Sequence, residues 1–256
     1  MLYNSEVWYG LTSKQVQKLI AVDVLFLRRL LNVVSGCPIE ALFLECGCVP
    51  FDIIVRTRRL KYLHHLVTRN QDEMLFRVFN AQLQSPVKND WTETVKEDLE
   101  VFGFQVENIW DLRSISRGKF KDMIKQKGRE VALKQLLARK EKHSKLTNLE
   151  YYEFKMQDYL SNGTLTIQQA QVVFKSRCRM TTYWENFKGW KLQKICPVCK
   201  DVAQIDTQSH SFQCKGIREV IAINGELKDI YQGNLSNQLV MTVVNIETFR
   251  KRYLEE

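Results

Sequence analysis

The residues Cys196-Pro197-Val198-Cys199 are followed by a ten-residue spacer and then by His210-Ser211-Phe212-Gln213-Cys214. Two thiols two residues apart can bind one metal ion from a single tight turn, and a His and a Cys four residues apart share one face of a helix. This spacing predicts a structural Zn2+ site. Four protein ligands fill a tetrahedral coordination sphere, so the metal is expected to stabilise the C-terminal part of the chain and not to activate water. The predicted ligands are Cys196, Cys199, His210 and Cys214.

Two other interpretations of this Cys-x-x-Cys pair are open. Such pairs also carry out thiol–disulfide exchange, but redox pairs usually open a helix within a βαβ unit, and no such pattern surrounds residues 196–199. The chain has seven cysteines, so chance clustering is the second alternative. The other four, Cys37, Cys46, Cys48 and Cys178, are expected to be buried small hydrophobic residues, and the odd total suits a reducing compartment.

The composition indicates a soluble globular chain. It has 256 residues, of which 45% are hydrophobic and 26% charged, which is typical of one or two domains with real cores. No long apolar run or secretory signal is visible, so we expect an intracellular protein of the nucleus or cytoplasm with no membrane partner. No nucleophile set or carboxylate cluster is evident either. We therefore expect no enzymatic activity and no small-molecule substrate.

Capping residues and apolar residues at helical spacing predict helices in both halves of the chain. Thr12-Ser13-Lys14-Gln15 is a capping box that starts a helix ending before Gly36. In a helix capped by Asp72, the expected core face consists of Met74, Leu75, Val78, Phe79 and Leu83. No strand-rich block is present, so the predicted fold class is mostly α. Further helices are expected to begin at Pro38, Pro50 and Asp90, at Ser114 or Ser116, at Thr166, and at Asn234 or Ser236.

The predicted fold divides at about residues 141–148. Around this point the tail from Arg139 to Lys145 loses the apolar period of the preceding helix. The expected organisation is a helical domain over residues 1–140 that ends in a basic helix, a linker over residues 141–148, and a smaller α-rich zinc-binding domain over residues 149–256.

Positive charge is concentrated in one segment. The whole chain has a net charge of +9, and residues 113–145 alone contain twelve Lys and Arg residues against three acids. A solvated helix usually mixes the two signs, whereas this segment repels itself unless an anion lies near it. Nucleic acid is the expected anion, and a solvated helix face is the alternative. The candidate contacts here are Arg117, Lys121, Lys125 and Arg129.

A second basic row occurs in the helix expected after Pro50. It consists of Arg58, Lys61, His65 and Arg69, which are spaced three and four residues apart and therefore share one helix face. This face either contacts phosphates or is simply solvated. Arg58 and Lys61 are its candidate nucleic-acid contacts.

Basic and aromatic residues alternate immediately before the metal motif. Residues 175–200 contain seven Lys and Arg residues against the single acid Glu185, interleaved with four large aromatic rings. Charges that follow phosphates and rings that stack on bases are what a single-stranded nucleic-acid surface needs. The alternative is that the rings pack a small metal-held core. The candidate contacts are Arg177, Arg179, Trp184, Lys188, Trp190 and Lys191.

Two parts of the chain resemble the region after the polymerase palm of LINE-type (non-LTR) retrotransposon reverse transcriptases. The opening Tyr3-Asn4-Ser5-Glu6-Val7-Trp8 is similar to a Tyr-Gly-Ser-Glu-x-Trp stretch of that family, with Asn4 in place of Gly. Phe26-Leu27-Arg28-Arg29-Leu30-Leu31 is similar to the Leu-Arg-Arg-Ile-Leu run of its thumb-like helix. Residues 174–180 and the Cys-Pro-x-Cys…His-x-x-x-Cys unit resemble the zinc-binding C-terminal segment of many such proteins.

This resemblance implies a thumb-like domain over residues 1–140 and a nucleic-acid partner, either element RNA or target DNA. The parent protein would be an RNA-directed DNA polymerase, and the opening residues suggest that the natural sequence begins earlier than Met1. The chain itself contains no Tyr-x-Asp-Asp palm motif, so it is not expected to polymerise DNA. The alternative function is a protein-interaction module in which zinc fixes a docking surface and the positive charges serve solubility.

Overall fold

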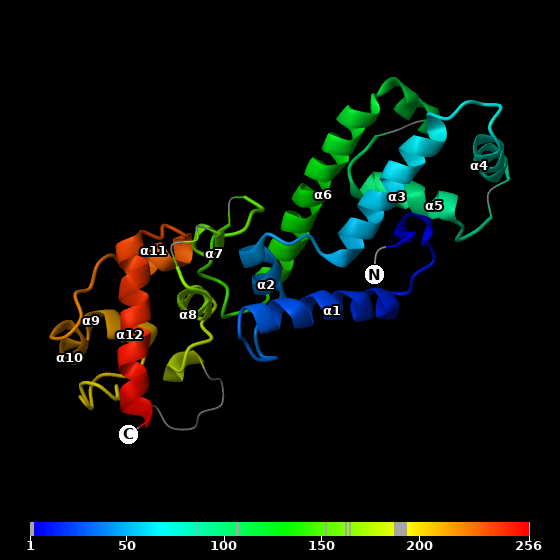
Figure 1. Cartoon of the computed structure of the whole chain (residues 1–256). Coiled ribbons are helices and arrows are strands. Elements are labelled where there is room, and N and C mark those ends of the chain that lie inside the picture. Colours follow the sequence, from blue (N-terminus) through cyan, green and yellow to red (C-terminus); the bar gives the residue numbers. More distant parts are fainter. Residues whose placement is uncertain are drawn as a thin grey trace. The chain divides into compact units, whose positions relative to one another are not determined.

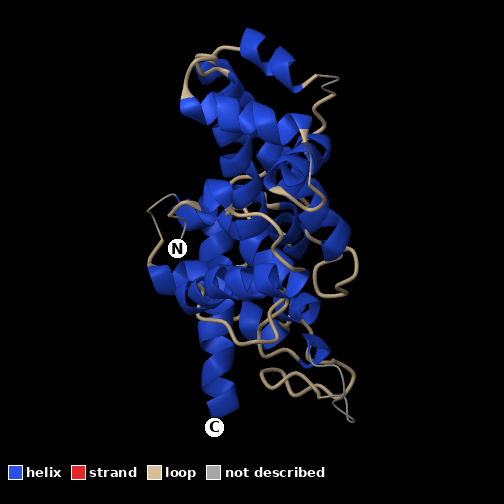
Figure 2. Ribbon diagram, turned by 90° about the vertical axis from the view of Figure 1, so that its right-hand side faces the viewer, coloured by secondary structure: helices blue, strands red, loops and turns tan. Residues whose placement is uncertain are grey.

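The computed structural model describes residues 3–85, 87–105, 108–151, 153–161, 163, 165–186 and 194–255. Within these ranges the regular structure is helical, and β pairing is limited to the isolated bridges Cys46–Met156 and Ile195–Ile205. Figure 2 shows this helix-and-loop architecture. The predicted mostly α fold is therefore confirmed. Among the described helices, none combines the length and the apolar character that crossing a membrane requires.

The chain forms two compact units. Unit 1 consists of Met1–Phe26 and Val49–Leu136, and unit 2 of Leu27–Cys48 and Leu137–Glu256. This grouping differs from the predicted domains, because residues 27–48 join the C-terminal part. The expected linker also packs into unit 2, where Leu146 is fully buried.

Helix α3 (Phe51–Val67) is the central helix of unit 1. Buried residues occur on much of its circumference, including Ile53, Leu60 and Leu63, so other elements surround it. The unit also contains η1 (Ser5–Val7), α4 (Met74–Gln84), α5 (Trp91–Val101) and η2 (Ile109–Ser114), and it shares α1 (Ser13–Leu30) and α6 (Arg117–Lys140) with unit 2 (Figure 1).

A buried carboxylate fixes α3 to α5. Asp98 is fully buried and accepts hydrogen bonds from Arg59 Nε at 2.6 Å and Arg59 Nη2 at 3.0 Å. Arg56 Nη1 donates to the same carboxylate at 2.6 Å. Two guanidinium groups offset the desolvation of one buried acid, so this cluster sets the register of the two helices.

The expected core face of α4 is wrong in part. Met74, Leu75 and Val78 are exposed, whereas Phe76 and Phe79 are buried. The two rings pack against indole rings from α5 and η2, and this aromatic cluster buries more area than the smaller side chains would. The helix also begins after Glu73 and not after Asp72.

Several predicted helix starts are confirmed. Asp90 caps α5 by accepting from the Glu93 amide at 2.8 Å. Thr166 and Gln169 form the predicted capping box of α8 (Ile167–Arg177). The Ser236 hydroxyl accepts from the Leu239 amide at 3.1 Å at the start of α12 (Asn237–Glu255).

Unit 2 builds its core around α12. A cluster of buried side chains joins the metal-motif cysteines to the inner face of this helix. Its members include Cys196, Phe212, Cys214, Ile217, Ile230, Leu239, Val243 and Ile246. The remaining helical elements of this unit are α2 (Ile39–Cys46), α7 (Asp158–Ser161), η3 (Trp184–Asn186), α9 (Gln208–Gln213), α10 (Lys215–Arg218) and α11 (Leu227–Gln232).

Candidate metal centre and basic surface

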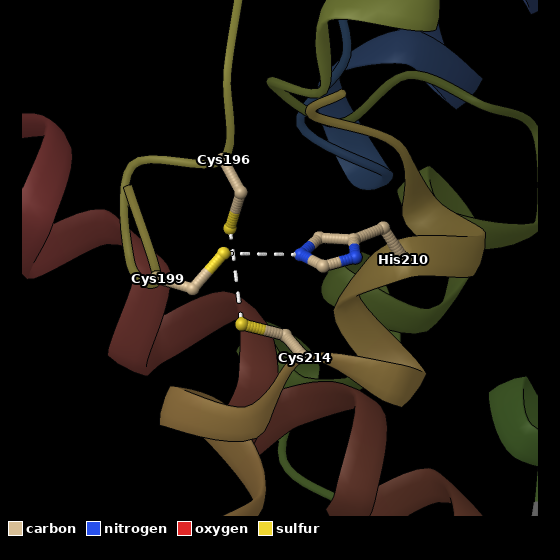
Figure 3. A group of neighbouring side chains, drawn as sticks. All are labelled: Cys196, Cys199, His210 and Cys214. Carbon is tan, nitrogen blue, oxygen red and sulfur yellow. Dashed lines mark hydrogen bonds between the residues drawn. The ribbon is translucent and has the colours of Figure 1, made fainter. Parts of the chain in front are cut away.

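The four predicted ligands converge in unit 2. The ligand atoms of Cys196, Cys199, His210 and Cys214 all lie within 4.8 Å of one another. Cys196 Sγ is 3.9 Å from Cys214 Sγ, and Cys199 Sγ is 3.4 Å from His210 Nε2 (Figure 3). A tetrahedral zinc ion with ordinary bond lengths separates two sulfurs by about 3.8 Å and a sulfur from a nitrogen by about 3.6 Å. The cluster therefore has the size of a tetrahedral metal site.

A short hairpin positions the first two cysteines. The Ile195–Ile205 bridge pairs its arms, and the Cys196 amide donates to the Gln204 carbonyl at 2.9 Å. The chain then turns back tightly, with the Lys200 amide 3.0 Å from the Cys196 carbonyl and Lys200 itself at a φ of 53°. This turn directs both thiols to the same side, as the sequence spacing predicts.

Helix α9 supplies the imidazole. Thr207 caps this helix by accepting from the His210 amide at 3.0 Å. Cys214 is not part of the helical face as expected; it lies at the break between α9 and α10, with φ −59° and ψ 122°. Its sulfur still points at the other three ligands in Figure 3, because the break turns the chain toward the hairpin.

The electrostatics of the cluster fit a cation. Cys196 and Cys214 are fully buried, while Cys199 and His210 are half-buried. Burial raises the pKa of Cys196 to about 12, and burial is also the main cause that lowers the pKa of His210. A neutral imidazole is the form that binds metal, and a bound cation would offset the desolvation of the thiolates. The four side chains could hold a metal ion in this position.

The hairpin and α12 are joined by a buried ion pair that the sequence analysis missed. Arg250 donates to Asp206 Oδ1 at 2.6 Å and Oδ2 at 3.2 Å, and its guanidinium lies 3.9 Å from the centre of the Tyr183 ring. The two residues are 44 positions apart, so no local pattern could reveal the pair. It holds the metal-binding hairpin against the last helix.

The segment before the metal motif is tied to α9. Glu185 accepts from the Gln208 amide at 2.7 Å and from Arg179 Nη2 at 3.1 Å. The Trp184 amide donates to Asp206 at 3.3 Å, and the Trp184 side chain is half-buried. Residues 179–186 thus share their hydrogen bonds with the elements that carry the metal ligands.

Arg177 is not available to nucleic acid, so that candidate contact is wrong. Its side chain is fully buried and pairs with the buried Glu45 of α2 at 3.0 Å. Of the other candidates in this stretch, Arg179 is half-buried and engaged with Glu185. Lys188, Trp190 and Lys191 lie outside the described residues.

Four of the other candidates lie together in unit 1. Arg58 and Lys61 are half-buried on α3, and Lys121 and Lys125 are exposed on α6. The pKa of Lys61 is lowered, first by burial and then by the charges of Lys121, Arg58 and Lys125. These four side chains form a surface that we call the α3–α6 basic face. Arg117 and Arg129 are exposed one turn before Lys121 and one turn after Lys125 on α6.

Close packing of α3 and α6 creates this face. His64 stacks on Phe120 with ring centres 4.5 Å apart. Further along α6, a Cβ added at Gly128 would lie 3.1 Å from Thr57 Oγ1 and 3.3 Å from a ring carbon of Phe102. Glycine at this position allows the helices to approach, and their basic rows consequently lie beside each other.

No protein-family model matches the chain, and comparisons with curated proteins and with solved structures likewise give no match.

Proposed function

We propose that the chain binds nucleic acid through the α3–α6 basic face and that Zn2+, bound by Cys196, Cys199, His210 and Cys214, stabilises unit 2. The observation that carries the nucleic-acid proposal is the surrounding of Lys61. The three side chains whose charges act on it are Lys121, Arg58 and Lys125, and all three are cations. Like charges gathered on two packed helices destabilise the protein unless an anion binds between them.

The length of the basic row on α6 favours a polyanion over a small anion. Arg117, Lys121, Lys125 and Arg129 follow one another at four-residue steps, so each is displaced by about 6 Å along the helix axis. A single phosphate would contact only one or two of these side chains. A nucleic-acid backbone offers phosphates at comparable intervals and releases counterions as each one is neutralised.

Zinc is the metal that the donor set favours. Three thiolates and one imidazole are soft and borderline ligands that suit Zn2+ in tetrahedral geometry. All four positions are protein ligands, so the site has no open place for water or substrate. We therefore assign it a structural role, in which the metal fixes the hairpin, α9 and the break after α9.

Salt-dependent binding tests the nucleic-acid proposal. The fluorescence anisotropy of a labelled 20-nucleotide DNA is measured from low to moderate salt with the zinc-loaded chain. We expect a steep loss of affinity, and Lys121→Gln with Lys125→Gln should reduce the logarithmic salt slope by about 0.7 per lost phosphate contact on a single strand. The matched control is Lys88→Gln with Lys96→Gln, which removes two exposed lysines of unit 1 outside the face. Binding that is insensitive to salt contradicts the proposal.

The parentage of the chain is a further part of the proposal. The resemblance of residues 3–8, of residues 26–31 and of the Cys/His unit to LINE-type reverse transcriptases supports a thumb and C-terminal origin, with element RNA or target DNA as the partner. An open reading frame upstream of Met1 that contains a Tyr-x-Asp-Asp palm motif would support this origin. A genomic region without coding sequence for a palm would count against it.

The alternative is a zinc-stabilised protein-interaction module. The exposed apolar side chains of α4, namely Met74, Leu75 and Val78, favour it because they leave an apolar helix face uncovered. Substitution of Trp184 and Trp190 by Ala separates the two functions. Nucleic-acid affinity should decrease if the aromatic segment supports binding, and it should not change if the chain is only a protein-interaction module.

A further inference from the structure

A histidine and an arginine extend the row of Arg58 and Lys61 on α3. His65 Nε2 lies 2.8 Å from Arg69 Nη2 and 3.3 Å from Arg69 Nε, and Arg69 Nη1 donates to Glu73 Oε2 at 2.6 Å. A guanidinium can only donate hydrogen bonds. The Nε2 atom must therefore be an acceptor, which makes His65 a neutral imidazole with its proton on Nδ1.

The charges around His65 keep it neutral. Its pKa is lowered first by burial and then by Arg69 on its own helix and Arg117 at the start of α6; Glu73, before α4, acts in the opposite direction and His64 lowers the pKa slightly. From η2, Arg113 donates to the Val67 carbonyl of the same helix end. The surroundings of the imidazole are thus mainly cationic, and its side chain is half-buried.

A bound phosphate would reverse this balance. An anion between α3 and α6 adds negative charge beside Arg117 and His65, which favours the imidazolium. Protonated Nε2 can no longer accept from Arg69. The guanidinium is then free to donate its released N–H groups to the anion, while its hydrogen bond to Glu73 is retained.

We propose that binding of a nucleic-acid phosphate to the α3–α6 basic face is coupled to protonation of His65, so that one proton is taken up from solvent and affinity rises on acidification. This inference rests on the proposed nucleic-acid function and concerns the regulation of the same site. The sign follows from linkage, because a ligand that prefers the protonated form binds more tightly as the pH falls from the pKa of the bound state towards that of the free state.

The test measures anisotropy of the same labelled 20-nucleotide DNA at pH 7.5 and pH 6.0, at one fixed ionic strength. We expect the affinity of the unmodified chain to rise about three- to tenfold at the lower pH. His65→Gln retains an acceptor for Arg69 but cannot titrate, so its affinity should be the same at both pH values. The matched control is His143→Gln, which removes an imidazole that is 42% exposed in unit 2 and should retain the full rise.

Each outcome has a distinct meaning. An equal rise in His65→Gln and in the unmodified chain overturns the coupling, and so does a flat response of the unmodified chain that still binds DNA; the proposed function survives both. Absence of DNA binding at either pH removes the proposed function together with the coupling. The titration of the His65 imidazole by NMR gives an independent measurement, in which the pKa of His65 should rise when the DNA is added.

Discussion

Glu45 and Arg177, which are 132 positions apart in the sequence, form an ion pair in which both side chains are fully buried. Arg177 Nε lies 3.0 Å from each carboxylate oxygen, and Nη2 lies 3.0 Å from Oε1. The hydroxyl groups of Tyr151 and Tyr159 donate to the same carboxylate, and Arg177 Nη1 donates to the Ile230 carbonyl. This network joins α2, α8 and the segments that surround them into unit 2.

Loss of one partner of this pair should be strongly destabilising. Glu45→Gln leaves a buried guanidinium without its counter-charge, and we expect unit 2 to lose about 3–5 kcal/mol of stability. Urea denaturation followed by circular dichroism measures this change. The control is Glu153→Gln, at a side chain that is 72% exposed, which should change stability by less than about 0.5 kcal/mol. A loss below about 1 kcal/mol for Glu45→Gln would show that the pair is not an essential contact.

The turn after α2 requires glycine. Gly47 has a φ of 59°, and a Cβ added there would lie 2.2 Å from the Met156 nitrogen and 2.3 Å from the Lys155 carbonyl carbon. Gly47→Ala must therefore displace backbone that is paired through the Cys46–Met156 bridge, and we expect a loss above about 3 kcal/mol. Gly163→Ala is the matched control, because Gly163 has a similar φ of 62° but no atom within 4 Å of the added Cβ. It should lose only about 1–2 kcal/mol, and equal losses in both variants would contradict the packing argument.

Unit 2 should lose stability at alkaline pH. The pKa values of Tyr151 and Tyr159 are raised well above the ordinary value, mainly by burial and then by the charge of Glu45. Because the folded pKa is above the unfolded value of about 10, the stabilisation is complete below that pH and decreases as the pH rises above it. Denaturation at pH 8, 9.5 and 10.5 should show this decrease. If all nine tyrosines of the folded chain titrate near pH 10 in the ultraviolet spectrum, the expectation is incorrect.

Local sequence determined the metal ligands and the helix starts, but not the long-range polar contacts. The Cys196–Cys199 spacing and the caps at Asp90 and Thr166 depend on residues within one turn of each other, so a pattern can predict them. Arg177 lies between Lys175 and Arg179 and looks like part of an exposed basic run. Its partner Glu45 belongs to a distant helix, and only the tertiary structure brings the two together.

The faces of short helices were equally difficult to predict. In α4, apolar residues occur around most of the circumference, so the sequence allows more than one core face. The rings of Phe76 and Phe79 face inward because Trp91 and Trp110 lie opposite them. By contrast, the basic row on α6 was predictable from its four-residue spacing, whereas its position beside Lys61 depends on the close approach at Gly128.

Removal of the metal should unfold unit 2 and leave the helices of unit 1 intact. Elemental analysis of the purified chain is expected to give about one zinc per chain, and Cys196→Ser should lose most of it. Because Cys196 and Cys214 belong to the same buried cluster as Leu239 and Val243, loss of the metal should expose α12 to proteolysis. Cys48→Ser, which lies outside the four ligands, should retain zinc and resist the protease. A Cys196→Ser protein with full zinc content and an unchanged digestion pattern would exclude the assigned role of this site.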